Sequence, residues 1–204
     1  MTPLRPEAAE YFKKSMENIE LKHVSKSFGE KEVLKDVSLT FPAGKVTALM
    51  GASGTGKTTM LSLILKLIRP DAGTITGIPE KKAAVFQEDR LFEDFSVLSN
   101  LTAATGKEEE AIKKGLAALG LSEAAFEKAG ILSGGMKRRA AILRALLSDY
   151  DLLVLDEPFK GLDEALREET ARYVLSENAG RTVIMVTHDP AEAELMGAEV
   201  IHLS

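Results

Sequence analysis

The fold of this chain is decided by the stretch Gly51-Ala52-Ser53-Gly54-Thr55-Gly56-Lys57-Thr58, which fits the pattern G-x-x-x-x-G-K-[ST]. A strand-like run, Lys45 to Met50, precedes it, and a helix-like run, Thr59 to Lys66, follows it. The glycines let consecutive N–H groups point at a polyphosphate, and the helix N-terminus adds partial positive charge. We therefore expect Lys57 to reach the β- and γ-phosphates of a nucleotide and the Thr58 hydroxyl to ligate Mg²⁺.

The composition indicates one globular protein without a membrane span of its own. The chain has 204 residues, 45% hydrophobic residues, a formal net charge of −5 and no cysteine. The absence of cysteine excludes disulfides and thiolate metal sites and is compatible with the cytosol. The negative charge disfavours a nucleic-acid surface. Apolar runs are too short to cross a bilayer, and the N-terminus lacks the apolar core of a signal peptide, so we expect a soluble protein.

The order of elements predicts an α/β domain over residues 19–204 behind an N-terminal extension, residues 1–18. In the extension, Glu7 to Asn18 has a short apolar stripe, which suits either a docked helix or tail, or a partner-binding helix. Residues 88–132 lack strand signals, and we interpret them as a helical insertion. Turns are expected over 26–30 and 42–44. Strands are expected over 19–24, 33–41, 46–50, 74–76, 83–86, 151–156, 181–187 and 199–203, and helices over 59–66, 107–119, 122–129, 134–148, 163–177 and 190–196.

Two adjacent carboxylates, Asp156 and Glu157, end one of the apolar strands. In a parallel sheet that end of the strand opens beside the phosphate-binding loop, so Asp156 would hold Mg²⁺ and Glu157 would polarise an attacking water. Taken alone, the pair could equally be two solvated acids at a strand end. The preceding phosphate-loop motif favours the functional interpretation.

Two further side chains follow strand-like runs. Gln87 could contact Mg²⁺ or water through a neutral amide, although a solvated glutamine is the simpler interpretation of that residue alone. His188 could hydrogen-bond a γ-phosphate from the same edge of the sheet. His23 and His202 lack such a context, and we interpret both as structural.

A second anion site is predicted where Ser133, Gly134 and Gly135 open a helix with exposed N–H groups and a hydroxyl donor. One ATP does not need two such sites from one chain. The economical arrangement is a head-to-tail dimer, in which Ser133 and Gly135 of one copy cap the ATP on the other copy's loop. The simpler alternative is a capped helix.

These motifs, in this order, resemble the nucleotide-binding subunit of ATP-binding-cassette (ABC) transporters. The resemblance covers about residues 19–203 and includes the Gln87 loop, the signature Leu132 to Met136, the D-loop Gly161-Leu162-Asp163 and His188. It implies a P-loop NTPase with a mostly parallel core sheet, an antiparallel β subdomain and a small helical subdomain.

The resemblance also implies roles for individual residues. Catalysis is assigned to Glu157, His188 and Lys57, and the metal to Thr58, Gln87 and Asp156. Phe28 matches the aromatic residue that stacks on adenine, with a core phenylalanine as the alternative. Nucleotide binding is assigned to Phe28, Gly51, Ser53, Gly54, Thr55, Gly56, Lys57, Thr58, Thr59, Gln87, Ser133 and Gly135.

The same resemblance implies an ATPase that powers transport, with ATP and Mg²⁺ as ligands. Its expected partners are a second ATPase subunit, a transmembrane permease docked near residues 88–105 and a solute-binding protein, with no nucleic acid. The subunit would lie in the cytoplasm, on the inner face of the membrane through the permease. Residues 85–91 and 132–139 look most like importers of nitrate, sulfonate or taurine.

Departures from the family pattern and two alternatives remain. Met136 replaces a more usual Gln, and Lys160 stands where a small residue is usual, so the dimer geometry could differ. We interpret Lys137, Arg138 and Arg139 as ion-paired, solvated surface. An ABC-type ATPase acting on DNA or ribosomes would show salt-dependent nucleic-acid binding. A P-loop small-molecule kinase would yield a phosphorylated product.

Overall fold

The computed structural model describes residues 17–203, so the extension up to Met16, including most of its expected helix, lies outside the described residues. The strands are β1 (Ile19–Phe28), β2 (Lys31–Phe41), β3 (Val46–Met50), β4 (Ala72–Thr76), β5 (Lys82–Val85), β6 (Leu152–Asp156), β7 (Thr182–Val186) and β8 (Glu199–His202). The helices are α2 (Lys57–Ile64), α3 (Val97–Thr105), α4 (Glu109–Ala118), the short 3-10 helix η1 (Ala129–Ile131), α5 (Gly134–Leu147), α6 (Glu164–Asn178) and α7 (Pro190–Leu195). The expected α/β class is confirmed.

A five-stranded parallel sheet with the order β5-β6-β7-β3-β8 forms the centre of the molecule. Every residue of β6 and of β7 is buried. Parallel strands are covered on both faces, which explains why these two segments are continuous apolar runs in the sequence. Asp156 pairs with Val186, and Leu49 of β3 pairs with the same residue, so the carboxyl ends of the three strands reach one edge.

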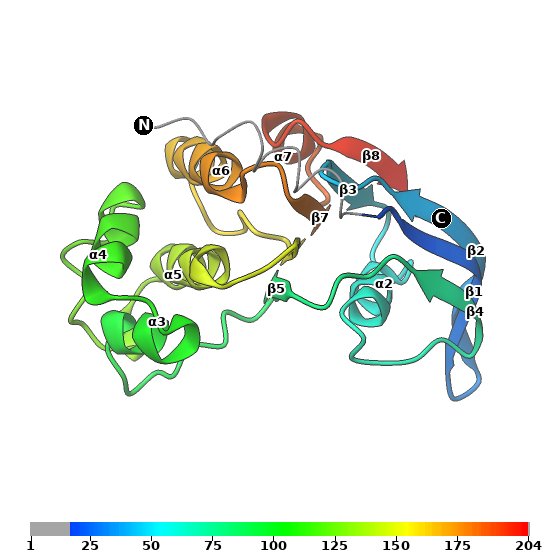
Figure 1. Ribbon diagram of the computed structural model, residues 1–204, viewed down its shortest axis with the longest axis horizontal. Helices are drawn as coiled ribbons and strands as arrows, with labels where there is room; N and C mark the ends of the chain where they lie inside the picture. The colour runs from blue at the N-terminus through cyan, green and yellow to red at the C-terminus, as the bar shows by residue number, and fades with distance from the viewer. Residues whose placement is uncertain (1–16, 204) are drawn as a thin grey trace.

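The two faces of the sheet are packed by different elements. Side chains alternate along a strand, so Leu153 and Leu155 of β6 point to one face and Leu152 and Val154 to the other. The first pair belongs to a buried cluster with side chains of α5, α6 and α7. The second pair belongs to a cluster with α2, β1 and β2. The sheet is therefore the middle layer, with α5, α6 and α7 on one face and α2 on the other (Figure 1).

The antiparallel sheet has the order β2-β1-β4 and lies at the opposite end of the molecule from α3 and α4 (Figure 1). The turn expected over residues 26–30 is wrong for its first three residues. Lys26 pairs with Leu34 and Phe28 with Lys31, so β1 continues to Phe28 and only Gly29 and Glu30 form the turn. Polar residues are tolerated here because an antiparallel sheet can face water on one side.

The segment between β5 and α5 forms α3 and α4, whose apolar side chains share a third buried cluster with α5. Helix α3 was not expected. Ser96 caps it, with its hydroxyl accepting a hydrogen bond from the Ser99 N–H at 3.0 Å. The helix expected over 122–129 is wrong, and that segment consists of turns, a bridge residue and the start of η1. Its carbonyls Ala125 O and Glu127 O accept hydrogen bonds from the first turn of α3 instead.

Gly77, just after β4, tests how closely the chain there approaches Asn18, just before β1. Gly77 has φ +72, and a Cβ there would lie 1.9 Å from the Asn18 carbonyl oxygen. Gly180 has φ +77, and no atom of residues 17–203 lies within 4 Å of such a Cβ, so it is a matched control. We expect Gly180→Ala to lower the free energy of unfolding by about 1 kcal/mol, the cost of a left-handed conformation. Gly77→Ala should lower it by about 3 kcal/mol or more, because backbone must also move. Urea denaturation measures both, and equal losses would contradict the close approach.

Candidate active site

The loop between β3 and α2 has the backbone shape of a phosphate-binding turn. Gly54 and Gly56 have φ of 87° and 92°, values that other residues rarely adopt. A Cβ at Gly56 would lie 2.7 Å from Leu34 Cδ2 and 3.1 Å from Val33 O, so a side chain there would force its neighbours to move. Gly56 is the N-cap of α2, and its carbonyl accepts the first helical hydrogen bond, from the Met60 N–H at 2.8 Å. The N–H groups of the first helical turn are therefore available to an anion.

The ammonium group of Lys57 folds back onto this loop. Lys57 Nζ donates hydrogen bonds to Gly51 O at 2.8 Å and Ala52 O at 2.7 Å. Two neutral carbonyls are weaker partners for an ammonium than phosphate oxygens are. The geometry thus keeps a positive charge at the loop, ready to exchange these carbonyls for an anion.

A cleft of about 350 Å³ opens beside the loop. It brings together nine of the residues predicted from the sequence, namely Ser53, Gly54, Gly56, Lys57, Thr58, Thr59, Gln87, Asp156 and Glu157. Three lining residues were missed, Lys31, Val33 and Val186. Val186 ends β7 two residues before His188 and could have been found from that position. Lys31 and Val33 carry no motif, because only the packing of β2 beside α2 brings them to the cleft.

Asp156 is the buried acid of the cleft, with 6% of its surface exposed. Burial raises the pKa of its carboxyl, and the neighbouring Glu157 charge raises it further. The charges of Arg138 and Lys57 and a hydrogen bond with Thr58 oppose that rise in the pKa. The structure therefore joins Thr58 and Asp156 directly, at a position where a cation would relieve an unfavourable charge.

Glu157 leaves the strand in a left-handed conformation, with φ of 49°, and its N–H donates to Val186 O at 2.9 Å. Such conformations are costly outside glycine and are concentrated at functional sites. The carboxylate lies between the Lys160 ammonium and the His188 imidazole. Lys160 Nζ is 3.2 Å from Oε2, and His188 Nδ1 is 3.6 Å from Oε1. His188 thus lies at the same edge as Glu157, with 73% of its side chain exposed.

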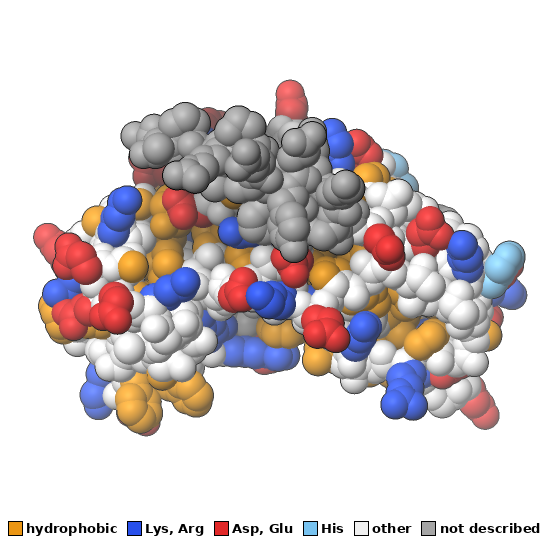
Figure 2. Space-filling view, viewed as in Figure 1, with side chains coloured by type: hydrophobic (Ala, Val, Ile, Leu, Met, Phe, Trp, Pro, Cys, Tyr) orange, Lys and Arg blue, Asp and Glu red, His pale blue; other side chains and the backbone are white. Residues whose placement is uncertain are grey.

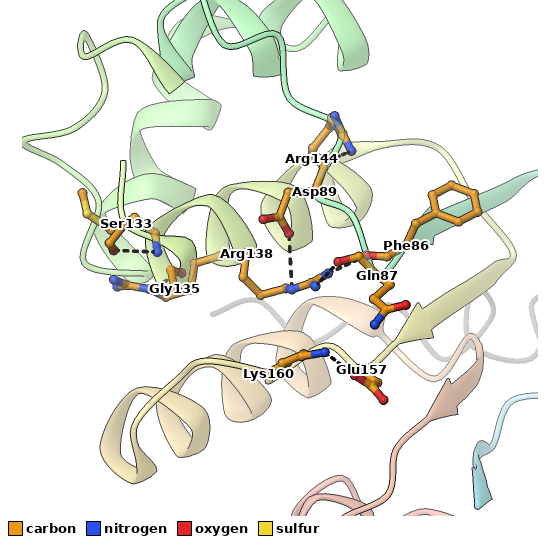
Figure 3. Close-up of polar contacts among 11 residues, drawn as sticks. Phe86, Gln87, Asp89, Ser133, Gly135, Arg138, Arg144, Glu157 and Lys160 are labelled. Atoms are coloured by element: carbon orange, nitrogen blue, oxygen red, sulfur yellow. Dashed lines mark hydrogen bonds and ion pairs between the residues drawn. The ribbon is translucent and has the colours of Figure 1, made fainter. Parts of the chain in front are cut away.

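The Ser133 motif lies outside the cleft of its own chain. Ser133 caps α5, and its hydroxyl accepts a hydrogen bond from the Met136 N–H at 3.3 Å. Ser133 and Gly134 are exposed. Among the described residues that line the cleft, neither Ser133 nor Gly135 occurs. Figure 3 shows both near the start of α5, well away from Gln87 and Glu157.

The structure also tests the expectations for Phe28 and for the basic run 137–139. Phe28 is 52% exposed, so the core alternative is wrong; Lys26 Nζ lies 5.6 Å from its ring centroid. Lys137 pairs with Glu93 as an ion pair. Arg138 and Arg139 are buried, at 4% and 7% exposure, so their interpretation as solvated surface is wrong. Their guanidinium groups are satisfied by backbone carbonyls, which is why they can lie inside.

A P-loop, paired acids at the end of β6 and a second glycine-rich helix start together define a nucleotide-hydrolysing cassette. Residues 34–160 match the ABC transporter family. The chain therefore belongs to the ABC transporter family and is an ABC-type ATPase subunit.

Curated relatives and solved structures agree with this assignment. The chain is 35% identical over 192 residues to the aliphatic sulfonates import ATP-binding protein SsuB 1 of Paracoccus denitrificans, covering 91% of this chain and 78% of that protein. It is 39% identical over 191 residues to SsuB of Escherichia coli, with 89% and 75% covered. The dimeric structure of MJ0796, a bacterial ABC transporter cassette, matches with a TM-score of 0.80 at 30% identity, covering 91% of this chain and 94% of that chain.

Removing the buried acid tests the electrostatics of the cleft. We expect Asp156→Asn to raise the melting temperature of the nucleotide-free protein at pH 7.5 by about 2–4 °C, the shift that about 1 kcal/mol produces in a domain of this size. The pKa of Asp156 is raised in the fold, so its carboxylate destabilises the protein only above the unfolded-state pKa. The gain should therefore shrink as the pH falls toward about 4.

Scanning calorimetry at both pH values measures this difference. Asp94→Asn is the matched control, because the Asp94 side chain is 95% exposed, and its melting temperature should stay near that of the wild type. A lower melting temperature for Asp156→Asn at pH 7.5 would contradict the expected burial effect.

Proposed function

We propose that this subunit hydrolyses ATP in the cleft beside Lys57 to drive the import of a small anion of the sulfonate, nitrate or taurine type. The convergence of Lys57, Thr58, Gln87, Asp156 and Glu157 on one cleft carries the proposal. The substrate class rests on relatives that are named for aliphatic sulfonate import. Residues 19–204 form the ATPase domain, with 88–132 as its helical insertion.

The chain's own residues supply binding and proton transfer. The loop N–H groups and Lys57 hold the β- and γ-phosphates. Glu157 accepts a proton from the water that attacks the γ-phosphorus, the bond to the β–γ bridging oxygen breaks, and ADP leaves. His188, 3.6 Å from Glu157, donates a hydrogen bond to the γ-phosphate and with Lys57 stabilises the developing charge.

The residues present fit Mg²⁺. Thr58, Asp156 and Gln87 would hold it, and the buried, disfavoured charge of Asp156 is what a cation would relieve. Residues 17–203 contain no cluster of three or more His, Cys, Asp or Glu side chains suited to a metal. That is compatible with Mg²⁺, which takes most of its ligands from phosphates and water. When bound, Mg²⁺ supplies positive charge to the phosphate oxygens.

Two copies complete two active sites in this proposal. Ser133 and Gly135 of one copy cap the γ-phosphate held by Lys57 of the other, and the exposed Phe28 stacks on adenine. The exposure of Ser133 and its absence from its own chain's cleft support this arrangement. The dimeric cassette among the similar structures supports it independently.

The permease is proposed to bind near residues 88–105, and a solute-binding protein would deliver the anion from outside. Phe92 and Phe95 are 67% and 59% exposed and pack edge to face. Figure 2 shows exposed apolar side chains at the α3 end of the molecule. In the described part of the chain, no helix is long and apolar enough to cross a membrane. In this proposal the permease attaches the subunit to the cytoplasmic face of the membrane.

The two alternatives have less support. Residues between Gln87 and Ser133 form a short helical cluster rather than a long coiled coil, which disfavours a DNA-repair ATPase. On the face in Figure 2, acidic and basic side chains are interspersed, which does not suit nucleic acid. A small-molecule kinase would have no use for the exposed Ser133 motif.

Substitution of the proposed base tests the chemistry. We expect Glu157→Gln to lower kcat for phosphate release by about 100-fold or more, because the amide cannot accept the proton. ATP binding should persist, and ATP should trap a dimer that light scattering detects. Glu123→Gln, at an exposed position in the turn after α4, is the control and should retain the wild-type rate. A Glu157→Gln protein as active as the wild type would refute the proposed role.

Mixing two inactive variants tests the shared site. Lys57→Ala damages the loop of its own site, and Ser133→Arg damages the site on its partner. In a mixed dimer both defects fall in one site and the other site is intact. Equal amounts of the two variants make about half of the dimers mixed, so we expect about a quarter of the wild-type phosphate release. If dimers form but no phosphate release is recovered at any mixing ratio, the shared site is contradicted.

A further inference from the structure

The loop that carries Gln87 is held by two arginines of α5. Loop residues 86–90 follow β5, and the carbonyls of Phe86 and Gln87 accept hydrogen bonds from Arg138, Nη1 and Nη2 respectively, both at 2.6 Å. The carbonyls of Arg90 and Asp89 accept from Arg144, Nη1 at 2.6 Å and Nη2 at 2.9 Å. Four of the five carbonyls of this loop are therefore bound by side chains of one helix. Figure 3 shows Arg138 reaching from α5 to the loop beside Gln87.

Arg138 is buried, with 5% of its side chain exposed. A buried charge is stable only when its donors are satisfied, and truncating its partners is strongly unfavourable. Besides the two carbonyls, Arg138 Nε lies 3.3 Å from Asp89 Oδ1, an ion pair without hydrogen-bond geometry. The side chain thus binds the loop at three points, and its charge also acts on Asp156 of the cleft.

The loop is further stiffened from its other end. The Arg90 guanidinium carbon lies 3.7 Å from the Phe86 ring centroid, so the two ends of the loop stack on each other. Arg90 has φ of 50°, which closes the loop back on itself. The loop is therefore a compact unit whose attachment to the rest of the protein includes Arg138 and Arg144.

Ser133 caps the same helix. Arg138 is five residues further along α5, about 7.5 Å along the helix axis. The middle of α5 is fully buried at Ala140, Ala141, Ile142 and Leu143, so close packing holds this part of the helix rigid. Any displacement of α5 would move Ser133 and the Gln87 loop together.

We propose that Arg138 and Arg144 are positioning residues that lock the Gln87 loop to α5. Gln87 then keeps a fixed position in the cleft of its own chain. It also keeps a constant distance from Ser133 of the same chain, which caps the nucleotide in the partner's cleft. This inference rests on the proposed function, since it assigns Gln87 to an ATP site. It adds that the two sites of the dimer are linked through a guanidinium–carbonyl clamp within each chain.

The planar fork of arginine is essential to this assignment. A guanidinium presents two parallel N–H donors that reach adjacent carbonyls, whereas lysine offers a single flexible ammonium. Arg138→Lys keeps the charge and loses the fork, so it separates positioning from electrostatics. We expect Arg138→Lys to lower kcat for ATP hydrolysis about tenfold, because small misplacements of a catalytic-site group have effects of this order. The KM for ATP should change less than about threefold, because Lys57 and the loop N–H groups still bind the phosphates.

A double-variant cycle with Gln87→Ala distinguishes positioning from general structural damage. If Arg138 acts through Gln87, Arg138→Lys should have no further effect on kcat once Gln87 is alanine. The inference would be overturned if the fold-loss of kcat in the double variant equals the product of the two single losses. An unchanged kcat in Arg138→Lys alone would overturn it as well. Arg172→Lys is the control, since its side chain is 66% exposed and pairs with Glu168 on the same helix. Its kcat should match that of the wild type.

Arg144→Lys provides a second cycle with the same two outcomes, and it decides the question if Arg138→Lys does not fold. Failure of the proposed function would look different. The function itself would be refuted if folded wild-type protein with Mg²⁺ does not hydrolyse ATP, either alone or with its permease. Only the clamp would be refuted if the wild type is active and the losses of kcat in the double variant multiply.

Discussion

The parallel pairing of β5, β6, β7 and β3 is the constraint on which the other features depend. Parallel strands all run the same way, so the chain leaves each of them at one edge of the sheet. The phosphate loop, Gln87, Glu157 and His188 are the segments that leave β3, β5, β6 and β7 at that edge. Each parallel connection needs a crossover, and the crossover elements cover both faces of the sheet. The parallel pairing therefore both gathers these segments at one edge and covers the two faces of the sheet.

Burial at this edge limits the stability of the protein. Asp156 ends a strand that is buried along its whole length, so its carboxylate lies where an ionised group is disfavoured. The left-handed conformation of Glu157 adds a second local cost. Both features are unfavourable for the nucleotide-free protein and useful to a protein that binds a cation and a phosphate. Under the proposed function, stability and activity are opposed at the same two residues.

Helix α5 connects the parts of the molecule. One side of it packs on the central sheet and another packs with α3 and α4, so it contributes to two hydrophobic clusters. Its N-terminus presents Ser133 to the outside, and its arginines bind the loop after β5. A change of orientation in this one helix would reach the exposed Ser133 motif, the aromatic surface near α3 and the ATP cleft at once.

The sequence by itself determined the parts whose signal is local. Three patterns predicted their structures: the glycine spacing of residues 51–58, the continuous apolar runs of β6 and β7, and the acids at the end of β6. Backbone conformation and burial leave a direct pattern in residue type, which is why these signals could be interpreted from the sequence. Nine predicted residues line the cleft for the same reason.

Only the tertiary structure decided the features that depend on partners distant in the chain. Residues 122–129 have a helix-like pattern, yet their carbonyls bond to the first turn of α3, so no local rule could identify their fold. The charged run 137–139 suggested a solvated surface, and it was corrected because carbonyls of residues 86, 87 and 119 satisfy Arg138 and Arg139 inside the protein. The burial of a charge depends on whether distant backbone groups can pair with it, and that is a property of the folded chain alone.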